Sequence, residues 1–308
     1  MSHVVQFGLV PPVSSDPPRV IAPQRASLFA QRARRFQSLA EGHVLGDWLG
    51  FLGRLSLAQH EALAGLGPLP LPDEAAMTRA HSHHMPLLPA RQWSRDPAWR
   101  RVLAQLVTTL GQHGPEAVQA SCRQLAAADP ATLEALADRV LDLELEGPQA
   151  SLLPYVAAAL QVYWTALAAE LGAEAMPALD VPGVCPCCGS LPVASVVRTA
   201  REVDKLRYLH CSLCNTEWHL VRVKCAACDA NAHIAYRHIE GSSLPNADAM
   251  RAETCDDCMS YLKILYQDLA PEGDPVADDL ATLALDLLAD AAGYARAGPN
   301  LLFVPGSS

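Results

Sequence analysis

The sequence has few aromatic residues and few charges. Phe, Trp and Tyr make up 6% of the 308 residues and Asp, Glu, Lys and Arg 18%, whereas half of the chain is hydrophobic. Such a composition is typical of a globular chain whose core is packed mainly by Leu, Ala and Val. The formal net charge of −10 is repelled by nucleic-acid phosphates and anionic membrane surfaces, so we expect neither as a partner.

Several chemical signatures are also missing. We find no glycine-rich phosphate loop, no nucleophile elbow and no pair of catalytic carboxylates, so we do not expect an enzyme. Residues 1–15 have no basic start and no long apolar run, so we expect no export signal and a cytoplasmic location. The apolar stretch 152–171 is long enough for a membrane span, but Gln161 interrupts it, and we expect a central buried helix.

Helical periodicity dominates the first half of the chain. Residues 1–24 are rich in Pro and Ser, and we expect them to be extended or disordered. Apolar residues then recur at helical spacing, which predicts an all-helical domain over residues 25–180, with a long Pro-rich connection at 67–93.

The pattern changes after Pro182. Helices are expected again at 261–266 and from 278 to about 292. Before them lie four short runs of β type, at 191–197, 206–210, 217–223 and 233–238.

Eight of the ten cysteines fall in four C-x-x-C pairs. In a reducing compartment this spacing indicates metal ligation rather than disulfides. Two residues between cysteines let one tight turn aim both sulfurs at a metal, and two such turns complete a tetrahedral site. We therefore predict two metal sites, formed by Cys185, Cys188, Cys211 and Cys214 and by Cys225, Cys228, Cys255 and Cys258.

The sequence leaves some choices open at these pairs. Sequential pairing is our interpretation, with crossed pairing or a redox-active dithiol as alternatives, and spacing does not separate iron from zinc. A residue that tolerates φ > 0 follows the second cysteine in three pairs: Gly189, Asn215 and Asp229. Met259 differs, which would fit a helix beginning there.

A few other Cys and His residues have a possible chemical role. Cys187 lies between two predicted ligands and is expected to be a spectator, and Cys122 a small buried hydrophobe. His81, His83 and His84 are expected in a solvated loop, with a metal site as the alternative. His210 and His219 are expected at ordinary strand positions, with hydrogen bonding to a metal ligand as the alternative.

The cysteine-rich segment is not basic. Between residues 181 and 262, eight Lys or Arg stand against nine Asp or Glu, a formal charge of −1. Four thiolates around a divalent ion add −2 at each site. A nucleic-acid-binding ribbon normally has a basic surface, so we expect a protein partner.

Long strings around these cysteines resemble one known family, the FdhE-type formate dehydrogenase accessory proteins. The resemblance is most specific after residue 183, and Cys187 departs from the family pattern. The strings are CPCCGSLPV from Cys185, LRYLHCSLCNTEWH from Leu206, YLKILYQ from Tyr261, VADDL from Val276 and GYAR from Gly293.

The resemblance implies an α+β chain with an all-helical N-terminal domain and two tandem rubredoxin-like (zinc-ribbon-like) modules. The expected boundaries are 181–222 and 223–262 for the modules and 263–308 for C-terminal helices and tail. It implies iron in both sites, with zinc as the alternative. It also implies a cytoplasmic factor that acts on the catalytic subunit of respiratory formate dehydrogenase before export. A rubredoxin-like redox protein and, less favoured, a zinc-ribbon nucleic-acid binder are the alternatives.

Overall fold

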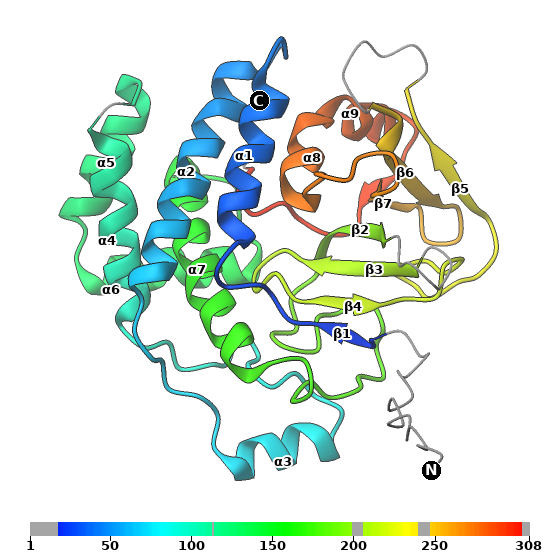
Figure 1. The fold of residues 1–308 in the computed structure, drawn as a ribbon, viewed down its shortest axis with the longest axis horizontal. Helices are drawn as coiled ribbons and strands as arrows, with labels where there is room; N and C mark the ends of the chain where they lie inside the picture. Colours follow the sequence, from blue (N-terminus) through cyan, green and yellow to red (C-terminus); the bar gives the residue numbers. More distant parts are fainter. Residues whose placement is uncertain (1–17, 113, 199–205, 240–246, 304–308) are drawn as a thin grey trace, which may run out of the picture.

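The computed structural model describes residues 18–112, 114–198, 206–239 and 247–303. It has a helical half and a sheet half that pack side by side (Figure 1), which confirms the α+β class. The helical half comprises α1 (Leu28–Ala40), α2 (Gly46–Gly65), α3 (Glu74–Ser82), α4 (Ala98–Gly111), α5 (Glu116–Ala127), α6 (Pro130–Asp142), the 3-10 turn η1 (Ala150–Leu152) and α7 (Leu153–Leu171).

Helix α7 is the centre of the helical half. It is apolar on almost every face, and 89% of its most apolar 18-residue stretch is buried inside the protein. Helices α2, α4 and α6 pack around it. Its length and hydropathy would also fit a membrane span, but here its apolar faces pack against protein, as expected from Gln161.

All the strands of the described chain belong to one sheet. Its order is β1-β4-β3-β2-β7-β6-β5, and β8 also pairs with β7. The pairs β2–β7 and β7–β8 are parallel and the others antiparallel. The strands are β1 (Val20–Ile21), β2 (Pro192–Arg198), β3 (Leu206–Cys211), β4 (Glu217–His219), β5 (Ile234–Arg237), β6 (Met250–Cys255), β7 (Ser260–Tyr266) and β8 (Ala295–Arg296).

The two cysteine segments repeat one arrangement within this sheet. Each consists of a cysteine pair, two strands, a second pair and a third strand: β2, β3 and β4 in the first, β5, β6 and β7 in the second. The parallel pairing of β2 with β7 joins the two repeats edge to edge. The module boundaries expected from the sequence stay predictions, because strands of both segments share the sheet.

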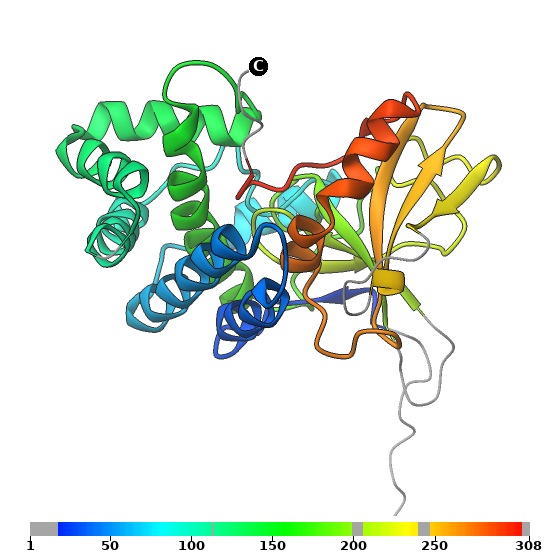
Figure 2. The same ribbon diagram turned by 90° about the horizontal axis from the view of Figure 1, so that it is seen from above.

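The C-terminal helices join the two halves. Helix α8 (Pro275–Ala281) contacts both α1 and strand β2, and α9 (Leu283–Ala291) packs against β6, as Figure 2 shows from above. One continuous helix was expected here, but Thr282 separates two. The 3-10 turn η2 (Ala247–Ala249) precedes β6.

Three other expectations about local structure were wrong. Residues 261–266 form strand β7 rather than a helix, because this short apolar run is buried on both faces of a central strand, where periodicity does not distinguish the two. Strand β4 ends at His219 instead of residue 223, and the Pro-rich connection contains helix α3. Residues 1–17 of the expected extended N-terminus and 304–308 of the tail lie outside the described residues.

Candidate metal centres

The structure brings the eight predicted cysteines together in two groups, in the sequential pairing. The first group is Cys185, Cys188, Cys211 and Cys214, and the second is Cys225, Cys228, Cys255 and Cys258. Within each group the four sulfurs all lie within 4.8 Å of one another. The described cysteines form no disulfide. Each group therefore offers four thiol ligands to one point in space.

The sulfur spacing fits a tetrahedral metal ion. Four sulfurs at about 2.3 Å from a central ion would lie about 3.8 Å apart, for tetrahedral geometry. In the second group, Cys225 Sγ lies 3.7 Å from Cys258 Sγ, and Cys228 Sγ lies 3.8 Å from Cys255 Sγ. The corresponding distances in the first group are 3.4 Å. Both groups are able to hold a metal ion, and neither distance identifies the metal.

Each C-x-x-C turn ends in a residue of left-handed conformation. The φ angles are +74° at Gly189, +60° at Asn215, +62° at Asp229 and +51° at Met259. Met259 therefore follows the same pattern as the other three, although no helix begins there. The turns also aim backbone amides at sulfur, since Leu213 N and Cys214 N lie 3.4 Å from Cys211 Sγ.

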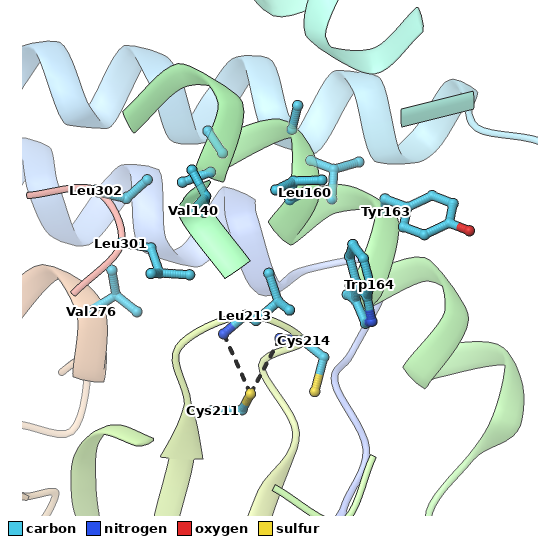
Figure 3. Close-up of a cluster of buried hydrophobic side chains, with 14 of the residues drawn as sticks. Val140, Leu160, Tyr163, Trp164, Cys211, Leu213, Cys214, Val276, Leu301 and Leu302 are labelled. Carbon is cyan, nitrogen blue, oxygen red and sulfur yellow. Dashed lines mark hydrogen bonds between the residues drawn. The ribbon is translucent and has the colours of Figure 1, made fainter. Parts of the chain in front are cut away.

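The first group lies inside the protein. Each of its cysteines is at most 1% exposed, and Leu213, between two of them, is fully buried. Figure 3 shows Leu213 pointing into the core, among Leu160, Trp164 and Leu301. The first group is therefore enclosed by the contact between the helical half and the sheet.

Helix α7 also holds the second turn of the first group through polar contacts. Gln161 Nε2 donates to the carbonyl oxygen of Ser212 at 2.8 Å, and Asn215 Nδ2 donates to Thr165 Oγ1 at 2.8 Å. The residues that hold this turn were not predicted. Gln161, a polar residue in an otherwise apolar helix, was the one feature of the sequence that indicated such a contact.

The first turn of the group is covered by the Pro-rich connection. Leu88 N and Ala90 N donate to the carbonyl oxygens of Cys187 and Cys188, at 2.8 and 2.9 Å. Gly189 is also closely approached, because a Cβ at this position would lie 3.1 Å from Pro86 Cγ. The connection therefore covers the first turn of this group.

Burial changes the ionisation of the thiols in the first group. It raises the pKa of Cys185 and of Cys211 well above the usual value for a thiol. Burial would also raise the pKa of Cys214, but hydrogen bonds from neighbouring thiols lower it instead. One ionised thiol thus disfavours ionisation of the others, and a bound cation would remove this penalty.

The second group is much more accessible. Cys225 and Cys255 are buried, but Cys258 is partly exposed and Cys228 is exposed. Cys258 Sγ lies 2.9 Å from Ser260 Oγ, and Ala227 N donates to Cys225 Sγ at 3.4 Å. The two groups therefore share one ligand pattern and differ in access from solvent.

Comparisons with known proteins agree with this architecture. Family models described as FdhE N-terminal, FdhE central domain and FdhE C-terminal domain match residues 17–180, 184–222 and 223–303. A protein of Stutzerimonas stutzeri named Protein FdhE homolog is 38% identical over 304 residues, with 98% of each chain covered. The chain belongs to the FdhE family.

Other FdhE proteins give the same result. A Protein FdhE homolog of Pseudomonas aeruginosa is 37% identical over 304 residues, again with 98% of each chain covered. The crystal structure of the FdhE protein from Pseudomonas aeruginosa matches with a TM-score of 0.84 and 37% identity. That match covers 94% of this chain and 100% of the other. The family resemblance that the sequence indicated is confirmed.

The remaining candidate residues of this FdhE-family chain lie outside the two groups. Cys187 is fully buried, and hydrogen bonding with Cys214 raises the pKa of its thiol well above the usual value. Cys122 is buried in α5, as expected. His210 reaches the first group indirectly, since its Nε2 lies 3.2 Å from Asn215 Oδ1. His219 packs edge-on against Tyr208.

The three histidines near residue 80 do not share one site. His81 lies in α3 rather than in a loop, and its Nε2 lies 3.1 Å from the carbonyl oxygen of Ala175. His83 follows the helix and is exposed, and His84 Nδ1 lies 3.3 Å from Asp180 Oδ1. Within the described ranges these histidines are not part of a group able to hold a metal ion.

We expect a chelator to remove metal from the second group more than about tenfold faster than from the first. Exposed Cys228 lets a chelator reach the second ion directly, whereas release from the first requires part of the core to open. Release of both ions can be followed with a coloured chelator. Two phases of equal amplitude are expected, and Cys228→Ser should leave only the slow phase. A single phase for the unmodified protein would contradict the assignment.

Proposed function

We propose that this protein is a cytoplasmic assembly factor for respiratory formate dehydrogenase, which binds the immature catalytic subunit. The observation that supports the proposal is the match to FdhE family models over residues 17–180, 184–222 and 223–303. The near-neutral charge of the cysteine-rich segment favours a protein client over a nucleic acid. The factor acts by binding rather than by catalysis.

We also propose that both cysteine groups ligate metal, iron in the first instance and zinc as the alternative. The sulfur spacing and the four left-handed turn residues support tetrahedral coordination. A metal there supplies structural rigidity, since four thiolates fix two turns and the strands that connect them. Elemental analysis of anaerobically purified protein, read with its visible spectrum, would identify the metal. Fewer than two equivalents of any transition metal per chain would contradict the proposal.

The proposed role predicts a direct complex with the client. The purified protein should retain the catalytic subunit of formate dehydrogenase in a pull-down, and a strain without it should lose most formate dehydrogenase activity. The activity should return when the gene is restored. Failure to associate, together with full activity in the deletion strain, would rule out this function.

One observation favours a second function, electron transfer by an iron ion in the second group. Its ligand Cys228 is exposed, so a redox partner could approach the ion closely. This function requires the metal to change oxidation state. A reversible reduction potential within the physiological range would support it, whereas a colourless zinc protein would exclude it.

A further inference from the structure

Large apolar side chains surround the accessible second cysteine group. Val221 and Val223 lie just before Cys225, and Met259 follows Cys258, with exposed fractions of 57%, 53% and 45%. Soluble proteins usually expose such side chains singly, and a contiguous set of them indicates an interaction site.

Two more residues belong to the same surface. Tyr236 Oη donates to the carbonyl oxygen of Arg222 at 3.3 Å, which places Tyr236 beside the two valines. Gly183 packs tightly against the first turn of the second group, since a Cβ at Gly183 would lie 2.0 Å from the carbonyl oxygen of Ala226. Val181, which is 59% exposed and two residues before Gly183, therefore lies near this turn. We call these five residues the apolar rim: Val181, Val221, Val223, Tyr236 and Met259. The rim holds five of the fourteen exposed large apolar side chains in the described part of the chain.

The rim encloses negative charge. The charged side chains beside the second group mostly have partners of their own: Lys224 Nζ lies 2.7 Å from Asp229 Oδ1, His233 Nδ1 lies 2.9 Å from Asp257 Oδ1, and Tyr294 Oη donates to Asp256 Oδ1 at 2.7 Å. Arg237 belongs to the same network, since its Nη2 donates to Tyr294 Oη at 3.2 Å. The negative charge that the rim encloses is therefore that of the second group itself, where four thiolates around a divalent ion would carry a formal −2.

Strand β5 gives this surface an edge to which an extended chain can pair. It is the last strand of the sheet and pairs with β6 on one side, while no strand among the described residues pairs with its other side. Figure 1 shows it at the end of the sheet far from the helical half. The rim residue Tyr236 lies within it. A segment added beside β5 would therefore pass next to the rim.

We propose that the apolar rim and the outer edge of β5 bind an extended segment of the client protein that carries apolar and basic residues. The inference rests on the proposed function and locates it on one surface. Backbone hydrogen bonds to β5 hold the segment, apolar side chains cover the rim, and basic side chains face the metal-thiolate charge.

The test uses charge substitutions on and off the rim. Met259→Lys and Val221→Lys each remove an apolar contact and place a cation where the segment is basic. Leu57→Lys and Val44→Lys are the controls, since Leu57 and Val44 are 44% and 94% exposed but lie in the helical half. Binding of the purified catalytic subunit should weaken about tenfold or more in each rim variant and less than twofold in the controls. Wild-type affinity should fall as salt rises.

Metal content decides how each result is interpreted. Val221 lies outside the C-x-x-C turns, so its variant should keep two metal equivalents, and that measurement accompanies every affinity. Rim variants that keep their metal and bind like the wild type would overturn the docking surface and leave the proposed function intact. If the wild-type protein itself does not bind the catalytic subunit, the proposed function fails and this inference fails with it.

Discussion

Cys188→Ser is expected to unfold the whole protein, whereas Cys228→Ser is expected to unfold only the segment around the second cysteine group. The apparent binding free energy of structural zinc in zinc-finger peptides is about 10–16 kcal/mol, which is similar in size to the whole stability of a typical protein, about 5–15 kcal/mol. Loss of metal from the first group should destabilise the core, because Leu213 packs among core side chains of α7 and the C-terminal segment.

Loss of metal from the second group should destabilise the rest of the protein much less. Cys228 is exposed, and β5 is an edge strand with only partly buried or exposed side chains. Strand β6 is held on its other side by β7, which pairs with it over six residue pairs. Loss of the second ion should therefore release β5 and its turn while the remaining sheet stays folded.

Circular dichroism with urea, combined with metal analysis, separates the two outcomes. Cys188→Ser should show no cooperative transition and no bound metal, whereas Cys228→Ser should keep one equivalent and most of the helical signal. Cys187→Ser is the matched control: its thiol is equally buried, but it is outside the group, so both ions should stay bound. Equal metal loss from all three variants would refute the ligand assignment.

Arg32→Met is expected to lower the free energy of unfolding by about 3–5 kcal/mol, because it leaves a buried carboxylate without its cation. Arg32 in α1 is fully buried, and its Nε donates to both carboxylate oxygens of Asp274 at 3.0 and 3.2 Å. Its Nη2 donates to Asn215 Oδ1 at 2.9 Å, beside the first cysteine group. This one side chain connects the helical half, a cysteine turn and the cap of α8.

Urea unfolding of Arg32→Met should be compared with Arg34→Met. Arg34 lies in the same helix but is exposed, so its replacement should change the free energy of unfolding by less than about 0.5 kcal/mol. A similar small effect of both substitutions would mean that the buried pair does not stabilise the contact between the halves.

The features predicted correctly from the sequence depend on residues close together in the chain. A C-x-x-C pair forms within one turn, and helical periodicity in the first half is a local pattern. The prediction for residues 261–266 was wrong because their conformation depends on distant partners: β7 lies between β2 and β6, and Lys263 is buried against Asp279 at 3.3 Å.

The different burial of the two cysteine groups could not be predicted for a related reason. Both have the same spacing, and the difference arises from residues that no local pattern connects to them. Gln161 and Thr165 in α7 hold one turn of the first group, and residues 86–90 cover the other. Access to the metal is thus a property of tertiary packing, whereas the ligand set is a property of the sequence.

The pairing of β1 with β4 limits how early in synthesis the N-terminal part of the chain can reach its final fold. Val20 pairs with Trp218, so the first strand must wait for about 200 further residues before its partner exists. At about 5–20 residues per second, this delay is about 10–40 s. Arg32 meets Asp274 only later still. The helical half leaves the ribosome first, but it reaches its final packing only when Leu301 and Leu302, near the end of the chain, enter its core.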